Sequence, residues 1–139
     1  MNIASRDGQL HIIEILLDSG ADIESKNMDG YTPLMMASTS NRLNIVEFLL
    51  DNGANIDSKS NDGYTSLICA ASERRDCVNI IKTLLNRGAD SKIKDNYGWS
   101  FIDYFRDNIN YEDDTALNKL KELVEDIRNK KRNIKPAKR

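Results

Sequence analysis

Apolar residues gather in three six-residue blocks along the chain, at residues 12–17, 45–50 and 80–85. In the middle block they follow an i, i+1, i+4, i+5 spacing from Ile45, which places them on one face of a helix. A shorter stretch of small and apolar residues, 34–38, precedes that block and predicts a second, short helix. Because one pair of short helices cannot bury its apolar face alone, the pattern predicts an all-α chain in which several pairs stack.

The segments between the blocks repeat with the same period. The sequence DGYTPL at residues 29–34 returns as DGYTSL at residues 62–67, which is 33 residues later. A glycine–alanine pair begins at Gly20, again at Gly53 after 33 residues, and at Gly88 after 35 more. Several landmarks that share one period are typical of a repeat protein. In the two DGYT motifs the threonine is the expected N-cap of the first helix, and the glycine of each glycine–alanine pair is the expected left-handed C-cap of the second.

These motifs resemble the ankyrin repeat, whose pattern runs D-G-x-T-P-L-H-x-A-A, then an apolar helix, then L-L-x-x-G-A-D. The resemblance covers roughly residues 1–105. It implies an all-α solenoid of helix-turn-helix repeats of about 33 residues, joined by hairpin loops and closed by a C-terminal capping helix.

The resemblance divides the chain into unequal repeats. The first is truncated, because its turn motif is missing and Gly8 matches the glycine between the two helices of a repeat. In chain order, the expected segments are a truncated repeat at 1–26, a full repeat at 27–59, a repeat at 60–94 with two extra residues around 73–76, an altered capping repeat and helix at 95–128, and a basic disordered tail at 129–139.

Several positions depart from the family pattern. Met35 and Ile68 replace the usual histidine, so its hydrogen bonds to a neighbouring hairpin should be missing. Bulky residues at 103–105 replace small ones in the fourth period, so a further repeat cannot stack there as the others do. Thr115 is the expected N-cap of the capping helix, whose apolar residues from Leu117 onward share one face.

The short first repeat leaves Ile12, Ile15 and Leu16 with less cover than their equivalents one period later. A terminal repeat that exposes apolar surface is a solubility liability. We therefore expect a weak N-terminal edge, in a protein that is a monomer or a weak dimer through that edge.

Composition and charge narrow the class of protein. Hydrophobic residues make up 40% and charged residues 30% of the 139 residues, as in one folded domain. The longest apolar run, residues 67–71, is far shorter than the about 20 residues of a membrane helix, and residues 1–8 lack the apolar core of a signal peptide. Residues 128–139 carry seven basic side chains and no acid, so the rest of the chain, with 13 basic and 22 acidic residues, has a net charge of −9.

The residues do not form a recognisable catalytic or metal-binding pattern. His11 is the single histidine and is expected on the surface, and the two cysteines, Cys69 and Cys77, are expected to be reduced thiols. Cys77 lies near the two-residue insertion and should be the more exposed of the two. The acidic residues 112–114 are better explained as the first turn of a helix than as a cation site. We therefore expect no enzyme activity, no cofactor, no metal and no small-molecule substrate.

Binding to a partner protein is the function that remains. In ankyrin proteins partners usually meet the hairpin tips and first helices, which line a concave groove. Successive repeats should stack about 10 Å apart and align their tip residues in columns, one of lysines and one of aromatic residues. Aromatic residues are enriched in protein interfaces. The residues expected to bind a partner are Lys26, Met28, Asp29, Tyr31, Lys59, Asn61, Asp62, Tyr64, Lys94, Asn96, Tyr97 and Trp99.

An alternative function is that of a nuclear or nucleic-acid-associated regulatory factor that uses the basic tail. The net charge of −9 on the rest of the chain argues against it, because nucleic-acid binding depends on neutralising phosphates. We expect a cytoplasmic location, with a nuclear one possible through the tail. Asn and Ile number 15 each, which suggests an AT-rich genome and a resemblance to the ankyrin proteins of large DNA viruses or intracellular parasites.

Overall fold

The computed structural model describes residues 1–73, 77–109 and 114–133. Within these ranges the regular secondary structure is entirely α-helical, which confirms the predicted all-α class. The helices are α1 (Asn2–Asp7), α2 (Leu10–Asp18), α3 (Pro33–Thr39), α4 (Leu43–Asp51), α5 (Ser66–Ser72), α6 (Val78–Asn86), α7 (Phe101–Asn108) and α8 (Asp114–Asn133).

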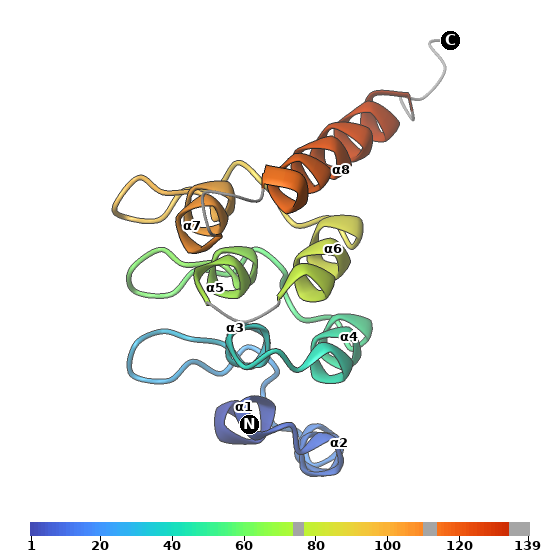
Figure 1. Ribbon diagram of the computed structural model, residues 1–139. Coiled ribbons are helices and arrows are strands. Elements are labelled where there is room, and N and C mark those ends of the chain that lie inside the picture. The colour runs from blue at the N-terminus through green and yellow to red at the C-terminus, as the bar shows by residue number, and fades with distance from the viewer. Residues whose placement is uncertain (74–76, 110–113, 134–139) are drawn as a thin grey trace, which may run out of the picture.

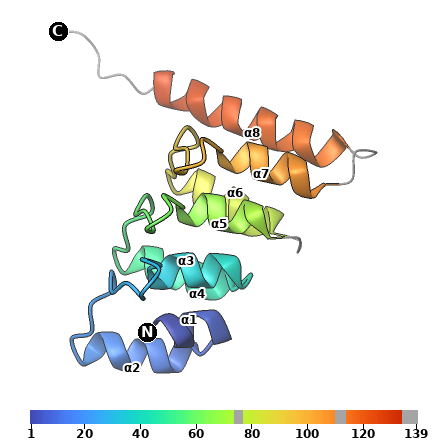
Figure 2. The same ribbon diagram turned by 90° about the vertical axis from the view of Figure 1, so that its left-hand side faces the viewer.

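The helices form two parallel columns. The first helices of the repeats, α1, α3, α5 and α7, stack on one another, and α2, α4 and α6 stack beside them (Figure 1). The loops that join one repeat to the next all project to the same side of the stack, which faces the viewer in Figure 2. Helix α8 closes the C-terminal end by packing on α6 and α7. This arrangement is a helical solenoid with a cap.

The turn residues act as the sequence predicts. The Thr32 hydroxyl accepts a hydrogen bond from the Met35 backbone N–H at 3.3 Å, and Thr65 does the same for Ile68 at 3.3 Å. These contacts satisfy N–H groups that a helix start otherwise leaves without a partner. The three predicted C-cap glycines occupy equivalent left-handed positions, with φ of +88° at Gly20, +88° at Gly53 and +98° at Gly88.

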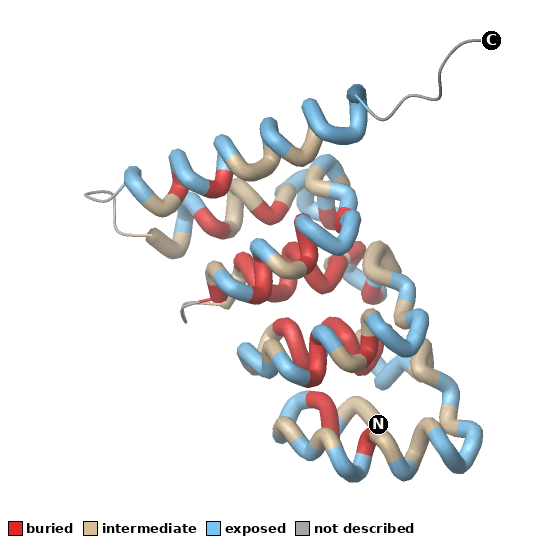
Figure 3. Tube along the Cα trace, turned by 90° about the vertical axis from the view of Figure 1, so that its right-hand side faces the viewer, coloured by how far each residue is buried: buried red, intermediate tan, exposed pale blue. Residues whose placement is uncertain are grey.

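The core runs through the middle repeats. Figure 3 shows buried residues concentrated in α3 to α6 and fewer in α1 and α2. Ile12 is 45% exposed, whereas Ile45, which occupies the same position one repeat later, is fully buried. Ile15 is 49% exposed and Ile3 is 65% exposed. The prediction that apolar residues of the first repeat have less cover is therefore confirmed.

The extra residues of the third repeat lie between its two helices. Three residues separate α3 from α4, and five separate α5 from α6, of which residues 74–76 lie outside the described part of the chain. The expectation that Cys77 is the more exposed of the two cysteines is wrong, because it is the N-cap of α6 and both cysteines are 3% exposed. Cys69 is buried in α5, and burial raises the pKa of its thiol to about 12.

Helix α8 departs from the sequence prediction at both ends. It begins at Asp114, so Thr115 lies in its first turn and is not its N-cap. It continues to Asn133, so residues 129–133 of the predicted disordered tail are helical. Lys130, Lys131 and Arg132 in its last turn favour this extension, because cations near a helix C-terminus interact well with the helix dipole. Of the acidic residues 112–114, which the sequence assigns to the first turn of a helix, only Asp114 lies among the described residues, and it begins α8. The rest of the tail, 134–139, lies outside them.

Candidate partner-binding surface

The hairpin tips owe their shape to one side chain in each repeat. The Asn27 Oδ1 atom accepts hydrogen bonds from the backbone N–H groups of Asp29 at 3.0 Å and Tyr31 at 2.9 Å. At the equivalent position of the next hairpin, the Ser60 hydroxyl accepts from the Tyr64 N–H at 3.1 Å. Each contact holds a tight turn in place and fixes the direction in which the following tyrosine leaves the backbone.

The third hairpin has a carboxylate at this position. Asp95 is 5% exposed, and its Oδ1 atom accepts from the N–H groups of Tyr97 and Trp99, both at 2.9 Å. Its other oxygen, Oδ2, accepts from the Tyr104 hydroxyl of α7 at 2.5 Å. The buried carboxylate therefore joins the third hairpin to α7.

Neighbouring hairpins are joined by asparagines. The Asn61 backbone N–H donates to the Asp29 carbonyl at 3.0 Å, and its side-chain amide donates to the Met28 carbonyl at 3.0 Å. Asn96 repeats the arrangement with the Asp62 and Asn61 carbonyls at 2.9 and 3.0 Å. Both asparagines were predicted to bind a partner, but these contacts give their amides a role in stacking the hairpins.

The close approach of the hairpins requires glycine. Gly30 has φ of +81°, and a Cβ atom there would lie 2.5 Å from Asn61 Oδ1 and 2.8 Å from the Asn61 backbone nitrogen. Gly63 stands in the same relation to Asn96, with distances of 2.7 and 3.0 Å. The glycine of the DGY motif therefore lets the next hairpin pack directly on the turn.

The aromatic residues form one continuous row across the hairpins and α7. The ring centroids of Tyr31 and Tyr64 are 6.4 Å apart and meet edge to face at 60°. Tyr64 meets Tyr104 at 6.1 Å and 83°, and Tyr104 meets Trp99 at 5.0 Å and 53°. We call these four residues the aromatic ladder.

The ladder is tighter than the sequence predicts. The ring centroids of Tyr31 and Tyr64 are 6.4 Å apart, which is less than the expected repeat spacing of about 10 Å, because the two rings are in edge-to-face contact. Tyr104 was not predicted to belong to the row, and its signal was the bulky segment 103–105 where the family pattern has small residues. Its ring fills the gap between Tyr64 and Trp99.

Burial differs along the ladder. Trp99 is 40% exposed, while Tyr31, Tyr64 and Tyr104 are half-buried. Burial raises the pKa of the Tyr31 phenol, and burial together with the Asp95 hydrogen bond raises the pKa of Tyr104. An unperturbed phenol is already neutral at physiological pH, and these shifts keep both side chains neutral to a higher pH.

Exposed apolar and basic side chains border the ladder at the hairpin tips. Met28 is 96% exposed and Tyr97 is 66% exposed. The three predicted lysines are exposed, and the Lys26 ammonium donates to the Lys59 carbonyl at 2.8 Å. Lys94 and Trp99 line a cavity of about 460 Å³ at the C-terminal end of the ladder, together with Gly98, Asp103, Arg106 and Asp107.

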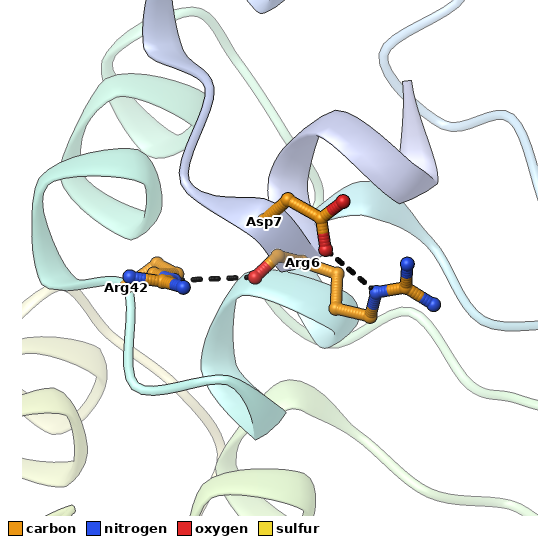
Figure 4. Close-up of polar contacts among 3 residues, drawn as sticks. All are labelled: Arg6, Asp7 and Arg42. Atoms are coloured by element: carbon orange, nitrogen blue, oxygen red, sulfur yellow. Dashed lines mark hydrogen bonds and ion pairs between the residues drawn. The ribbon is translucent and has the colours of Figure 1, made fainter.

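A second group of charged residues lies at the opposite ends of the helices and has a structural role. Arg42, just before α4, donates from Nε to the Arg6 carbonyl at the end of α1 at 3.2 Å (Figure 4). Arg6 in turn donates to Asp7 at 2.8 Å, and this hydrogen bond lowers the pKa of the Asp7 carboxyl. Arg42 thus satisfies a carbonyl that the helix end leaves unpaired and joins the first repeat to the second.

Among the described residues, His, Cys, Asp and Glu side chains do not gather in any group of three or more that could hold a metal ion. His11 is exposed, with Nδ1 3.6 Å from the Glu14 carboxylate, as the sequence predicts for a surface residue. In the same ranges, no helix has both the length and the apolar character needed to cross a bilayer.

A comparison with models of protein families shows to which family the chain belongs. A family model described as ankyrin repeats (3 copies) matches residues 1–95. The chain belongs to the ankyrin repeat family. A search of the curated proteins found no match. Ankyrin repeats are generally protein–protein interaction modules and typically have no catalytic activity. In this ankyrin protein the loops that carry the hairpin tips project from one side of the stack (Figure 2). Tyr31, Tyr64 and Trp99 of the ladder lie in these loops, and Tyr104 lies in α7.

Proposed function

We propose that this ankyrin protein is a non-enzymatic module that binds a partner protein along the aromatic ladder. The observation that carries the proposal is the continuous row of four aromatic rings, bordered by the exposed Met28 and Tyr97 at the hairpin tips. Large aromatic residues that are already held in place lose little conformational freedom on binding, and such residues dominate the energy of many interfaces.

The shape of the row favours one kind of partner segment. Rings that touch in a line offer a narrow apolar strip, which suits an extended segment or one face of a helix. Lys26, Lys59 and Lys94 border the strip at three successive hairpins. Such cations favour acidic neighbours in the partner segment and speed its association.

The alternative is a nuclear or nucleic-acid-associated factor. The basic C-terminal turn of α8 and the basic residues that follow it favour this alternative. The net charge of −9 on the rest of the chain opposes it. We propose a cytoplasmic location for a protein that binds a partner protein and a nuclear one for a nucleic-acid-associated factor. A mobility shift of labelled DNA that disappears when residues 129–139 are removed would favour the nucleic-acid-associated factor.

Photo-crosslinking from single positions tests the proposed surface. A photoreactive amino acid at Met28 or Tyr97 lies at the tip of a hairpin, and the same amino acid at Glu47 lies exposed on α4, in the other column of helices. We expect the two hairpin positions to capture the same protein from a cell extract and the α4 position to miss it. Capture of one protein from α4 alone would overturn the proposed surface.

A further inference from the structure

A pair of cavities lies where α8 crosses the loop that follows α6. The larger cavity, of about 360 Å³, is bordered by the end of α6, the loop at 88–92 and α8. The smaller cavity, of about 320 Å³, is bordered by the adjoining part of that loop, α7 and α8. The two cavities share Ser91, Lys92, Val124 and Arg128. They lie between α8 and the loop that follows α6, and the smaller one shares Lys94 with the cavity at the C-terminal end of the aromatic ladder.

The walls of these cavities are basic, although most of the chain is acidic. Lys92, Lys94, Arg128 and Lys131 line one or both of them. The one carboxylate among the lining residues is Asp90, and its Oδ1 atom already accepts the Lys92 backbone N–H at 2.9 Å. The cations that line the cavities outnumber the lining carboxylates, and such a surplus of positive charge attracts an anion.

The Arg128 guanidinium has an unused donor. Its Nε atom is hidden from solvent and has no hydrogen-bond partner, and its nearest carboxylate, Glu125, lies 3.8 Å from the other end of the group. A buried donor without a partner is uncommon and costs stability, so a small rotation of the side chain toward a bound acceptor is favourable. The planar guanidinium suits two oxygens of one phosphate or carboxylate group.

Part of the lining of the larger cavity is apolar. Leu85, Ala89, Val124 and Ile127 line it together with the basic residues. Its volume of about 360 Å³ is much larger than one anion of a few atoms fills, which leaves room for an organic group. A phosphate monoester carries about two negative charges at neutral pH and so matches several cations better than a single carboxylate does.

We propose that the larger of the two cavities binds a phosphate monoester, with its phosphate among Lys92, Arg128 and Lys131 and its organic part on Val124 and Ile127. The monoester is a small organic phosphate or a phosphorylated side chain of another protein. Both sources present the same group, and the probes below distinguish them.

The test is a titration of the full chain followed by NMR, with phenyl phosphate, inorganic phosphate, benzoate and a phosphoserine peptide as probes. We expect saturable shifts of the backbone amides of residues 88–94, with phenyl phosphate binding more tightly than inorganic phosphate or benzoate. Tighter binding of the peptide than of phenyl phosphate would assign the pocket to phosphorylated side chains, and the reverse order to small organic phosphates. Benzoate that binds as tightly as phenyl phosphate, or no saturation, would overturn the proposal.

Matched variants separate this pocket from general charge. Lys92→Gln with Arg128→Gln removes two charges from it, and Lys82→Gln with Lys119→Gln removes two charges from another cavity of about 350 Å³ beside α8. We expect the first pair to weaken phenyl phosphate binding at least about tenfold and the second to change it less than about twofold. Equal losses in both pairs would overturn the proposal. If the first pair unfolds, Lys92→Gln with Lys131→Gln replaces it, since both side chains are exposed.

Discussion

The Tyr104 hydroxyl donates a hydrogen bond to the buried Asp95 carboxylate at 2.5 Å, and this contact joins α7 to the third hairpin. The same tyrosine also holds Trp99 and Tyr64 in ring contact. One side chain outside the predicted tip residues therefore supports the end of the aromatic ladder.

Removing that hydroxyl should cost stability and leave the ladder in place. Tyr104→Phe keeps the ring but deprives the buried Asp95 of one of three donors. We expect the free energy of unfolding in urea to fall by about 1–2 kcal/mol, the usual cost when a buried polar group loses a partner. Tyr97→Phe is the control, because its side chain is 66% exposed and it should change stability little. Equal losses in the two variants would show that the Asp95 contact contributes nothing.

Glycines with the same backbone conformation should differ in their tolerance of a methyl group. Gly53 and Gly30 have φ of +88° and +81°, but a Cβ atom at Gly53 meets nothing within 4 Å, and one at Gly30 lies 2.5 Å from Asn61. Gly53→Ala should therefore cost about 1–2 kcal/mol from backbone strain alone. Gly30→Ala should cost measurably more and loosen the contact between hairpins. Equal unfolding free energies for the two variants would contradict this account of hairpin stacking.

The first repeat should open before the second. Ile12 is 45% exposed and Ile45 is fully buried at the equivalent position. Ile45→Ala should cost about 2–5 kcal/mol of unfolding free energy, and Ile12→Ala much less. Hydrogen exchange should be faster in residues 10–18 than in residues 45–50. Equal protection of the two segments in a proven monomer would contradict this prediction, whereas equal protection only at high concentration would indicate a dimer through this edge.

The buried thiol should make the protein less stable at alkaline pH. The pKa of Cys69 is raised from 9.0 to about 12 by burial, so above pH 9 the unfolded chain loses a proton that the folded chain keeps. The folded state is therefore disfavoured as pH rises from 9 toward 12, by up to about 1.4 kcal/mol per pH unit for this one proton.

Cys69→Ala tests this linkage. We expect the unfolding free energy of the variant to fall less steeply between pH 9 and 10 than that of the parent chain, with no difference in slope between pH 6 and 8. The tyrosines whose pKa is raised in the folded chain also steepen the fall toward pH 10, but both proteins contain them, so the difference between the two slopes reports Cys69. Identical slopes in the two proteins above pH 9 would contradict the assignment.

The repeat architecture was predictable because its signals are local. The caps at Thr32 and Thr65 and the left-handed turns at Gly20, Gly53 and Gly88 depend on a few neighbouring residues, and the structure places all of them as predicted. The tip positions follow from the period in the same way.

The features that sequence reasoning missed depend on packing between repeats. The ring contact of Tyr104 with Tyr64 and the side-chain amide contacts of Asn61 and Asn96 join residues that are 33 to 40 positions apart. The burial of Cys77 depends on how α6 packs. A period fixes which residues are equivalent, but it does not say whether a side chain turns to solvent or to the next repeat. The end of α8 was missed because a run of lysines and arginines suggested disorder, although cations favour the last turn of a helix.

The central claim is that the aromatic ladder binds the partner, and the affinity of a ladder variant tests it most directly. Once crosslinking has supplied the partner, its dissociation constant is measured by calorimetry for the parent chain, for Tyr31→Ala with Tyr64→Ala, and for the exposed control Asn44→Ala with Glu47→Ala on α4. The ladder variant should lose about 2 kcal/mol or more of binding free energy while its circular dichroism stays helical. The control variant should bind as the parent does. A folded ladder variant with unchanged affinity would contradict the claim.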